Sequence, residues 1–363
     1  MKKDPRPAGD PAALLLGWFA VHRRDLPWRQ NRSLYRVWVA EVMLQQTRVE
    51  TVVPYYRRFL RRFPTLKRLA EAPLQDVLKA WEGLGYYSRA HNLWQAARLV
   101  RDNFHGRIPG DYGEFRKLLG VGDYIAAAVL SIGCGLAFPV VDGNVLRVVC
   151  RWQGIGTDIR RQSTREVVRA FLQEIIPPAA PGEFNEALME LGALICTPKN
   201  PACGQCPLRP RCHAHGRGLT AALPVKSRRA PQPLFQVALA VIVRGGKFFI
   251  QQRPEQGHLG GLWEFPGGKC RATEKPEQAV VRECREEIAA EVKVLAKLAE
   301  VPHAYTHFKI VLHVFVCRLR SGNPRTGQPH AWVKFAELRK YPFPAANHKF
   351  FAQLEEYLDS DLV

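Results

Sequence analysis

Four cysteines, Cys196, Cys203, Cys206 and Cys212, follow one another in the pattern C-x6-C-x2-C-x5-C. Thiols this close together in a chain are either joined in disulfides or bound to a metal. Disulfides are disfavoured because we expect no signal peptide and because the other five cysteines are scattered like ordinary core residues, at positions 134, 150, 270, 284 and 317. Zinc and iron–sulfur clusters both accept four thiolates, and spacing alone does not separate them. The sequence therefore predicts a ligated loop at 196–212.

The texture of the chain changes near residue 223. Apolar residues recur at helical spacing from Pro11 to Arg217, with prolines as breaks, as in the two segments on either side of Pro73. Later runs are β-rich, and one strongly helical stretch interrupts them; the β runs are 236–243, 247–252 and 310–317, and the helix is 276–288. The 363 residues therefore predict two domains.

The boundary between these domains is rich in proline. Residues 223–233 hold three prolines and several basic residues, which suits an extended linker. We predict an all-α domain over residues 1–222, the linker over 223–233, and an α/β domain over 234–363.

The chain is strongly basic, with 53 Lys plus Arg against 33 Asp plus Glu and a formal net charge of +20. Both halves share the excess, so it is not a charged tail. Each phosphate that a Lys or Arg neutralises releases counterions, which favours a polyanionic partner. The alternative is a generally basic surface without such a partner.

Two uncharged segments resemble membrane or targeting sequences and fail in detail. Residues 12–21 are followed by His22 and charged residues, without a small-residue cleavage site. Residues 124–141 contain glycines and Pro139, which favours a buried helix and a turn. We expect a protein of the cytoplasm with no membrane partner.

Residues 115–129 predict two short helices joined by a Gly-Val-Gly turn. Gly120 and Gly122 permit positive φ and a close approach of the backbone to a partner. The free N–H groups at the start of the second helix suit a phosphate oxygen. The segment looks like a helix-hairpin-helix, although a Gly-x-Gly turn alone is weak evidence.

Two carboxylates stand in apolar surroundings. Glu41 is the sole acidic residue between Asp25 and Glu50, and Asp142 follows Val140-Val141. A buried carboxylate is costly unless it is paired or used, although Asp142 also suits a helix N-cap. Hydrolysis of a glycosidic bond needs such a pair, one to protonate the leaving group and one to stabilise the sugar cation.

These motifs together resemble the MutY-type adenine DNA glycosylases of the endonuclease III superfamily. The match covers most of residues 11–217; it includes 26–29, 39–47, 81–89, the hairpin, 141–144, 184–193 and the cysteine loop. The resemblance implies a helix-hairpin-helix glycosylase fold and a [4Fe–4S] cluster on Cys196, Cys203, Cys206 and Cys212.

The resemblance also implies roles for single residues. Glu41 would protonate adenine at N7 and later activate water, and Asp142 would stabilise the sugar cation, with Tyr124 and Asn144 supporting the pair. The remaining positions would line the adenine pocket or insert into the DNA stack; the pocket set is Arg24, Trp28, Arg29, Leu44, Val49 and Glu186, and the wedges are Gln46 and Tyr86.

The main rival within the superfamily is endonuclease III, which also cleaves the DNA strand. Its lyase chemistry needs an amine where this sequence has Tyr124, and no lysine occurs between Lys117 and Lys199. We therefore predict a monofunctional glycosylase that leaves an abasic site.

The second domain fits the Nudix signature, with Ala289 where that signature has glycine. The glutamates Glu283, Glu286 and Glu287 lie within little more than one helical turn and suit a divalent metal such as Mg²⁺. Residues 276–283 and 343–347 resemble the MutT-type nucleotide hydrolases. Residues 261–266 and 303–308 resemble the C-terminal domain of the adenine glycosylases, which recognises 8-oxoguanine in DNA.

Recognition is the interpretation we favour for this domain over nucleotide hydrolysis. Residues 301–336 hold no Asp or Glu, whereas a hydrolase is expected to add a carboxylate from this region and a DNA-facing surface favours cations. Thr306 and His307 would contact 8-oxoguanine, and Asn347 is a further candidate.

For the whole chain we expect a monomer that excises adenine opposite 8-oxoguanine or guanine in double-stranded DNA. The runner-up is a non-catalytic iron–sulfur protein that binds DNA.

Overall fold

The computed structural model describes residues 9–227 and 231–359. Part of the predicted linker, residues 228–230, lies outside the described residues, as do 1–8 and 360–363. The described chain divides into two compact units. The helical unit comprises 9–70 and 95–227, and the sheet unit comprises 71–94 and 231–359.

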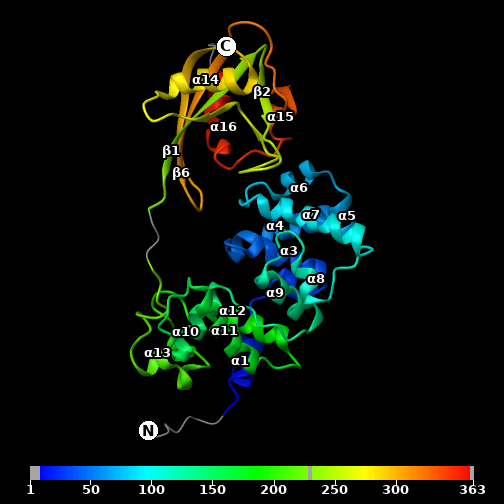
Figure 1. Ribbon diagram of the computed structural model, residues 1–363, viewed down its shortest axis with the longest axis vertical. Helices are drawn as coiled ribbons and strands as arrows, with labels where there is room; N and C mark the ends of the chain where they lie inside the picture. Colours follow the sequence, from blue (N-terminus) through cyan, green and yellow to red (C-terminus); the bar gives the residue numbers. More distant parts are fainter. Residues whose placement is uncertain (1–8, 228–230, 360–363) are drawn as a thin grey trace. The chain divides into compact units, whose positions relative to one another are not determined.

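Helices account for almost all regular structure before residue 217, as the apolar spacing predicts (Figure 1). The α-helices are α1 (Pro11–His22), α2 (Pro27–Gln30), α3 (Leu34–Leu44), α4 (Val49–Arg62), α5 (Leu66–Glu71), α6 (Leu74–Trp81), α7 (Ser88–Asn103), α8 (Tyr112–Arg116), α9 (Asp123–Cys134), α10 (Gly143–Gln153), α11 (Gln162–Ile175), α12 (Pro181–Leu194) and α13 (His213–Gly216). Two 3₁₀ turns, η1 (Cys203–Gln205) and η2 (Arg209–Arg211), lie in the cysteine loop.

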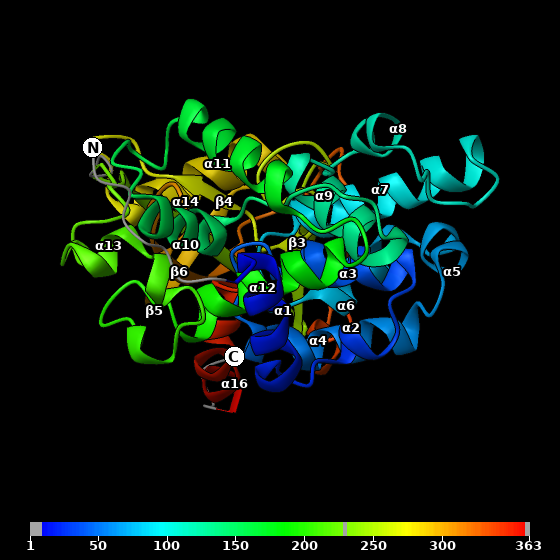
Figure 2. The ribbon, with the colours of Figure 1, turned by 90° about the horizontal axis from the view of Figure 1, so that it is seen from below.

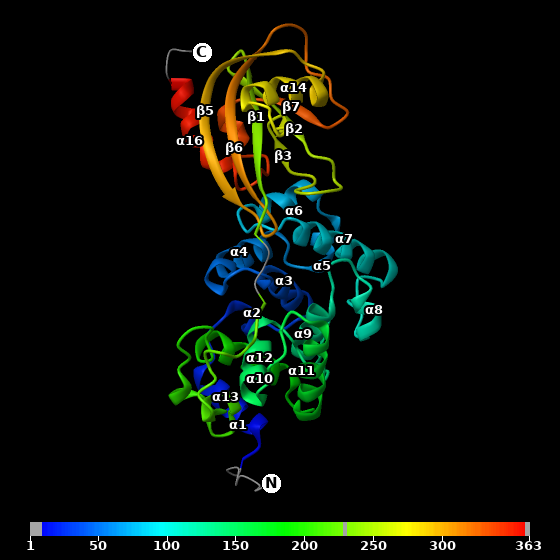
Figure 3. The same ribbon diagram turned by 60° about the vertical axis from the view of Figure 1, so that its left-hand side comes forward.

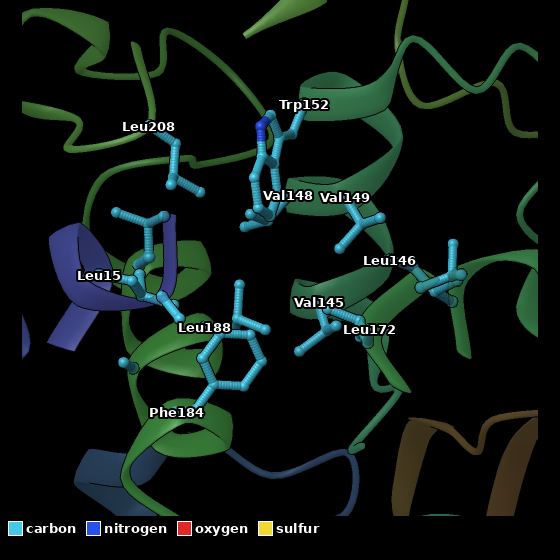
Figure 4. Packing of buried hydrophobic residues seen from close by; sticks show 14 of the residues in the cluster. Leu15, Val145, Leu146, Val148, Val149, Trp152, Leu172, Phe184, Leu188 and Leu208 are labelled. Atoms are coloured by element: carbon cyan, nitrogen blue, oxygen red, sulfur yellow. The ribbon is translucent and has the colours of Figure 1, made fainter. Parts of the chain in front are cut away.

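Helix α1 lies beside α12, although some 170 residues separate them along the chain (Figure 2). Their apolar faces share one buried cluster with α10 and α11, shown in Figure 4. The members that the view labels are Leu15, Val145, Leu146, Val148, Val149, Trp152, Leu172, Phe184, Leu188 and Leu208. This core fixes the starts of α10 and α12, which carry candidate site residues.

The sheet unit is built on a seven-stranded mixed sheet of order β3-β2-β1-β6-β5, with β4 paired to β1 and β7 to β2. Strands β1 and β6 run parallel, whereas β5 and β6 form an antiparallel pair. The strands are β1 (Leu234–Arg244), β2 (Lys247–Gln252), β3 (Trp263–Glu264), β4 (Gly267–Lys269), β5 (Val292–Ala304), β6 (Lys309–Leu319) and β7 (His330–Val333).

Alternating residues of β1 enter two apolar clusters, one on each face of the sheet. One cluster includes α14 (Pro276–Ile288), and the other includes η3 (Asn347–Phe350) and α16 (Phe351–Asp359) (Figure 3). A short helix, α15 (Phe335–Leu338), contributes Leu338 to the second. The bounds of α14 agree with the sequence prediction. Ala289, in place of the signature glycine, adopts a left-handed backbone with φ of 47°.

Residues 71–94 pack within the sheet unit through polar contacts. Gln75 accepts a hydrogen bond from Trp263 Nε1 at 2.9 Å, and its Nε2 donates to the Gly261 carbonyl at 2.8 Å. Tyr87 donates to the Phe343 carbonyl at 3.1 Å. The turn after α6 is thereby held by the C-terminal part of the chain.

Candidate active site and iron–sulfur loop

Glu41 lies on α3 and is 3% exposed. Its neighbours on the helix are apolar, so the sequence buries this carboxylate with no basic residue on the same turn. Tyr124, near the start of α9, donates a hydrogen bond to Glu41 Oε2 at 2.5 Å. The structure therefore brings two of the predicted catalytic residues into contact.

Burial is the largest influence on Glu41 and raises its pKa to about 7. The Tyr124 hydrogen bond and the Arg29 charge lower the pKa, whereas the negative charges of Glu186 and Asp142 raise it. A carboxyl with this pKa is half protonated near neutrality and is suited to general acid catalysis.

Asp142 caps the N-terminus of α10, as the sequence allowed, and its negative charge acts on Glu41. Its carboxylate accepts hydrogen bonds from the Val145 N–H at 2.7 Å and from Asn144 Nδ2 at 3.1 Å. Burial raises the pKa of Asp142 despite these bonds. Arg147 in turn donates from Nη2 to Asn144 Oδ1 at 2.8 Å and from Nε to the Cys196 carbonyl at 2.6 Å, which joins this segment to the cysteine loop.

The predicted adenine-pocket residues divide into a buried ionic network and an apolar group. Arg24, Arg29 and Glu186 belong to the network, in which Arg29 Nε donates to Glu186 Oε1 at 2.9 Å. Burial raises the pKa of Glu186, against the lowering charges of Arg32 and Arg29. The apolar group comprises Trp28, which is 7% exposed, and the partly buried Leu44 and Val49.

The two predicted wedges, Gln46 and Tyr86, are exposed and have positive φ values of 57° and 50°. Residues other than glycine adopt a positive φ at an energetic cost. Such strained residues are concentrated at functional sites. Tyr86 belongs to the sheet unit, and its hydroxyl accepts a hydrogen bond from Thr306 Oγ1 at 2.5 Å.

The hairpin between α8 and α9 forms where the sequence predicts it. Gly120 uses the positive φ that a glycine permits, at 76°, whereas Gly122 has a φ of −90° with extended ψ. Gly122 is the N-cap of α9, and no atom lies within 4 Å of the place where its Cβ would stand. The open backbone there leaves space for a phosphate.

The four cysteines of the loop line one cavity together with Arg151. Arg151 is 2% exposed and donates to Cys196 Sγ at 3.4 Å and to the Thr197 carbonyl at 2.7 Å. The described residues give it no carboxylate partner, so a buried cation faces the thiols. A cluster bound by four thiolates supplies the missing negative charge, and the residues therefore fit it.

Within the described ranges, no three His, Cys, Asp or Glu residues stand close enough to hold one metal ion. The same finding covers the Nudix glutamates. Arg282 donates to Glu283 at 2.7 Å, to Glu286 at 2.8 Å and to Glu274 at 2.8 Å, which ties these carboxylates to a cation.

Glu287 is held by hydrogen bonds inside the sheet unit, whereas the two recognition candidates His307 and Asn347 differ from each other in exposure. Glu287 accepts hydrogen bonds from Gln251 Nε2 at 3.1 Å and from the Gly267 N–H at 3.0 Å. His307 is exposed at the tip between β5 and β6, whereas Asn347 is 4% exposed and its Nδ2 has no partner in the described structure.

Two residues near the site, Glu190 and Asn185, were not predicted from the sequence. Glu190 on α12 binds Arg24 and Arg29, and Asn185 holds the segment before Asp142 through the Val140 N–H at 3.0 Å. The signal available for Glu190 was its position four residues after Glu186 on one helix of largely apolar composition, which places both carboxylates on the same buried face.

Family models match three parts of the chain. Residues 39–178 match the HhH-GPD superfamily of base excision DNA repair proteins, 196–212 match the iron–sulfur binding domain of endonuclease III, and 237–353 match a NUDIX domain. A solved structure described as a thermostable thymine-DNA glycosylase aligns with 57% of this chain and 95% of its own, at 27% identity and a TM-score of 0.53. The fold and these matches are thus those of a helix-hairpin-helix base excision repair protein with an iron–sulfur cluster.

Relatives narrow the class further. The adenine DNA glycosylase of Rattus norvegicus is 35% identical over 94% of this chain and 77% of its own length. That of Buchnera aphidicola subsp. Schizaphis graminum is 35% identical over 70% of this chain and 73% of its own. The chain belongs to the adenine DNA glycosylase family. The predictions of fold class, iron–sulfur loop and Nudix domain are confirmed.

No helix of the described residues is long and apolar enough to cross a membrane.

Proposed function

We propose that this protein is a monofunctional glycosylase that hydrolyses the N-glycosidic bond of adenine opposite 8-oxoguanine or guanine in duplex DNA. The observation that best supports this proposal is the state of Glu41. Burial raises the pKa of this carboxyl to about 7, the negative charge of Asp142 also raises it, and the carboxylate accepts a hydrogen bond from Tyr124. Strand cleavage would need an amine nucleophile at position 124, and this sequence has a tyrosine there. The tyrosine therefore supports hydrolysis without strand cleavage.

In this mechanism protonated Glu41 transfers its proton to N7 of adenine as the bond to the sugar breaks. Asp142 stabilises the sugar cation with its negative charge, which Asn144 and the α10 N-terminus orient. Glu41 then accepts a proton from the attacking water. The pocket residues hold the extruded adenine. Gln46 and Tyr86 each insert into the DNA stack, which offsets the few kcal/mol of unstacking.

The iron–sulfur cluster is of the [4Fe–4S] type in this proposal and is held by Cys196, Cys203, Cys206 and Cys212. When bound it cross-links the loop and so orders it. Arg151 balances its charge, and Arg147 connects the Cys196 carbonyl to Asn144. The hairpin glycines and the loop both present backbone to phosphates.

For the sheet unit we propose recognition of 8-oxoguanine through Thr306 and His307, with Asn347 in support. Thr306 already contacts Tyr86, so the recognition loop and the wedge act at the same place in the unit. The hydrolase alternative has weaker support because Arg282 engages Glu283 and Glu286. We also propose that the protein is a monomer of the cytoplasm that associates with the nucleoid by binding DNA.

The test is single-turnover incubation with duplexes that carry adenine opposite 8-oxoguanine, guanine or thymine. We expect abasic product with the first two and an intact strand until alkali is added. Strand cleavage with enzyme trapped by borohydride would contradict the monofunctional assignment. Turnover of 8-oxo-dGTP with magnesium, lost in Glu283→Gln, would restore the hydrolase alternative for the sheet unit.

A further inference from the structure

Glu190 is a buried carboxylate next to the proposed adenine pocket to which the proposed mechanism gives no task. It lies on α12 one turn after Glu186, and its side chain is 2% exposed. Such burial is costly for an anion unless partners compensate it. Its partners are two arginines more than 160 residues away in the chain.

Arg24 binds Glu190 in the bidentate geometry that fixes a guanidinium most firmly. Nε donates to Oε1 at 3.1 Å and Nη2 donates to Oε2 at 2.8 Å. The backbone N–H of Arg24 adds a third bond to Oε1 at 2.8 Å. Glu190 therefore fixes both the side chain and the main chain of Arg24.

Arg29 binds the same carboxylate from another side. Nη1 donates to Glu190 Oε1 at 3.1 Å and to the Arg24 carbonyl at 2.9 Å, and Nη2 donates to Glu190 Oε2 at 3.3 Å. Glu186 takes the Nε hydrogen. Of the five N–H groups of a guanidinium, these contacts use four, so among the described residues one Nη2 hydrogen stays available for a base.

We propose that Glu190 is a positioning residue that fixes Arg24 and Arg29 at the adenine pocket and balances their charge. This inference rests on the proposed function, because it assigns Glu190 a task in adenine excision. Hydrogen bonds from both arginines outweigh the effect of burial and lower the pKa of Glu190 to about 2, so the carboxylate is charged throughout the working range.

The charges around Glu190 also affect the pKa of Glu41, the proposed catalytic acid. The groups that act on Glu41 are Tyr124 from α9, Glu186 from α12, Asp142 before α10 and Arg29 from α2, and the positive charge of Arg29 lowers the pKa of Glu41. With Glu190 neutral, Arg29 keeps only Glu186, which it shares with Arg32. The site then gains net positive charge, and Glu41 gives up its proton at a lower pH.

The experiment is a single-turnover pH profile on a duplex with adenine opposite 8-oxoguanine, for the wild type, Glu190→Gln and Glu190→Asp. In Glu190→Gln we expect a rate roughly ten- to hundredfold lower, since loosened arginines misplace the base. We also expect the pH at which activity falls on the alkaline side to decrease by about one unit. Glu190→Asp keeps the charge and should restore the pH profile more fully than the rate.

Glu183→Gln is the matched control, since Glu183 lies on α12, pairs with Arg32 and is 41% exposed. We expect it to match the wild type in both rate and pH profile. An unshifted alkaline limb in Glu190→Gln overturns the inference even if the rate falls, because a purely structural role predicts that result. If Glu190→Gln loses the visible absorption of the cluster, Glu190→Asp decides: a wild-type rate in that variant overturns the positioning role. Failure of the wild type to release adenine would instead refute the proposed function.

Discussion

Replacement of Glu41 by glutamine should stabilise the fold while removing the proposed catalytic acid. Glutamine has nearly the same shape, carries no charge, and its carbonyl oxygen still accepts the Tyr124 hydrogen bond. Because burial raises the pKa of Glu41 to about 7, the wild-type fold disfavours the ionised form that the unfolded chain adopts freely.

The magnitude follows from linkage between protonation and folding. Below the ordinary carboxyl pKa both states are protonated, and Glu41 costs little. As pH rises towards the folded-state pKa the unfolded chain loses its proton first, so the fold loses stability. The cost is about 1 kcal/mol near pH 5.5 and about 3 kcal/mol near pH 8. Glu41→Gln does not have this cost. The difference in free energy of unfolding between Glu41→Gln and the wild type should therefore grow by about 2 kcal/mol from pH 5.5 to pH 8.

Urea unfolding of the wild type and Glu41→Gln at both pH values, followed by circular dichroism, measures this difference. The adenine-release rate of the same preparations shows the functional loss. An equal free energy of unfolding for both proteins near pH 8, or an advantage of Glu41→Gln that does not grow with pH, would refute the argument that Glu41 is held at a cost to stability.

Three further substitutions test other parts of the site. Gly192→Ala should lower the excision rate by about tenfold with little loss of cluster, because the new Cβ would stand 2.6 Å from Asn144 Cβ; an unchanged single-turnover rate would show that Asn144 does not need its position. Arg151→Met should reduce the cluster content seen by visible absorption, whereas retention of full absorption would mean that the thiols do not need this buried cation. Tyr86→Phe and Thr306→Val should each weaken discrimination for 8-oxoguanine over guanine by a few-fold, and the double variant should be no worse than either; additive losses would show that the two hydroxyls act independently.

The parts of the fold that local sequence controls were predictable. The apolar period and the prolines place α5 and α6 on either side of Pro73, and the bounds of α14 agree with its prediction. Cysteine spacing located the cluster loop because its ligands are close together in the chain. Glu41 was identifiable because a single acidic residue in an apolar helix must be buried.

Contacts between distant segments were not predictable in the same way. The link from Glu190 to Arg24 spans 166 residues and depends on how α12 packs beside α1. The attachment of residues 71–94 to the sheet unit depends on contacts such as Gln75 with Trp263. Gly122 also shows that a glycine permits, but does not require, a positive φ.

The central claim is that Glu41 and Asp142 together release adenine from DNA. Its most direct test is single-turnover release of adenine opposite 8-oxoguanine by the wild type, Glu41→Gln and Asp142→Asn, with duplex binding measured in parallel. The account predicts release by the wild type and a loss of at least about a hundredfold in each variant, with duplex binding retained. Release by either variant at the wild-type rate would contradict it.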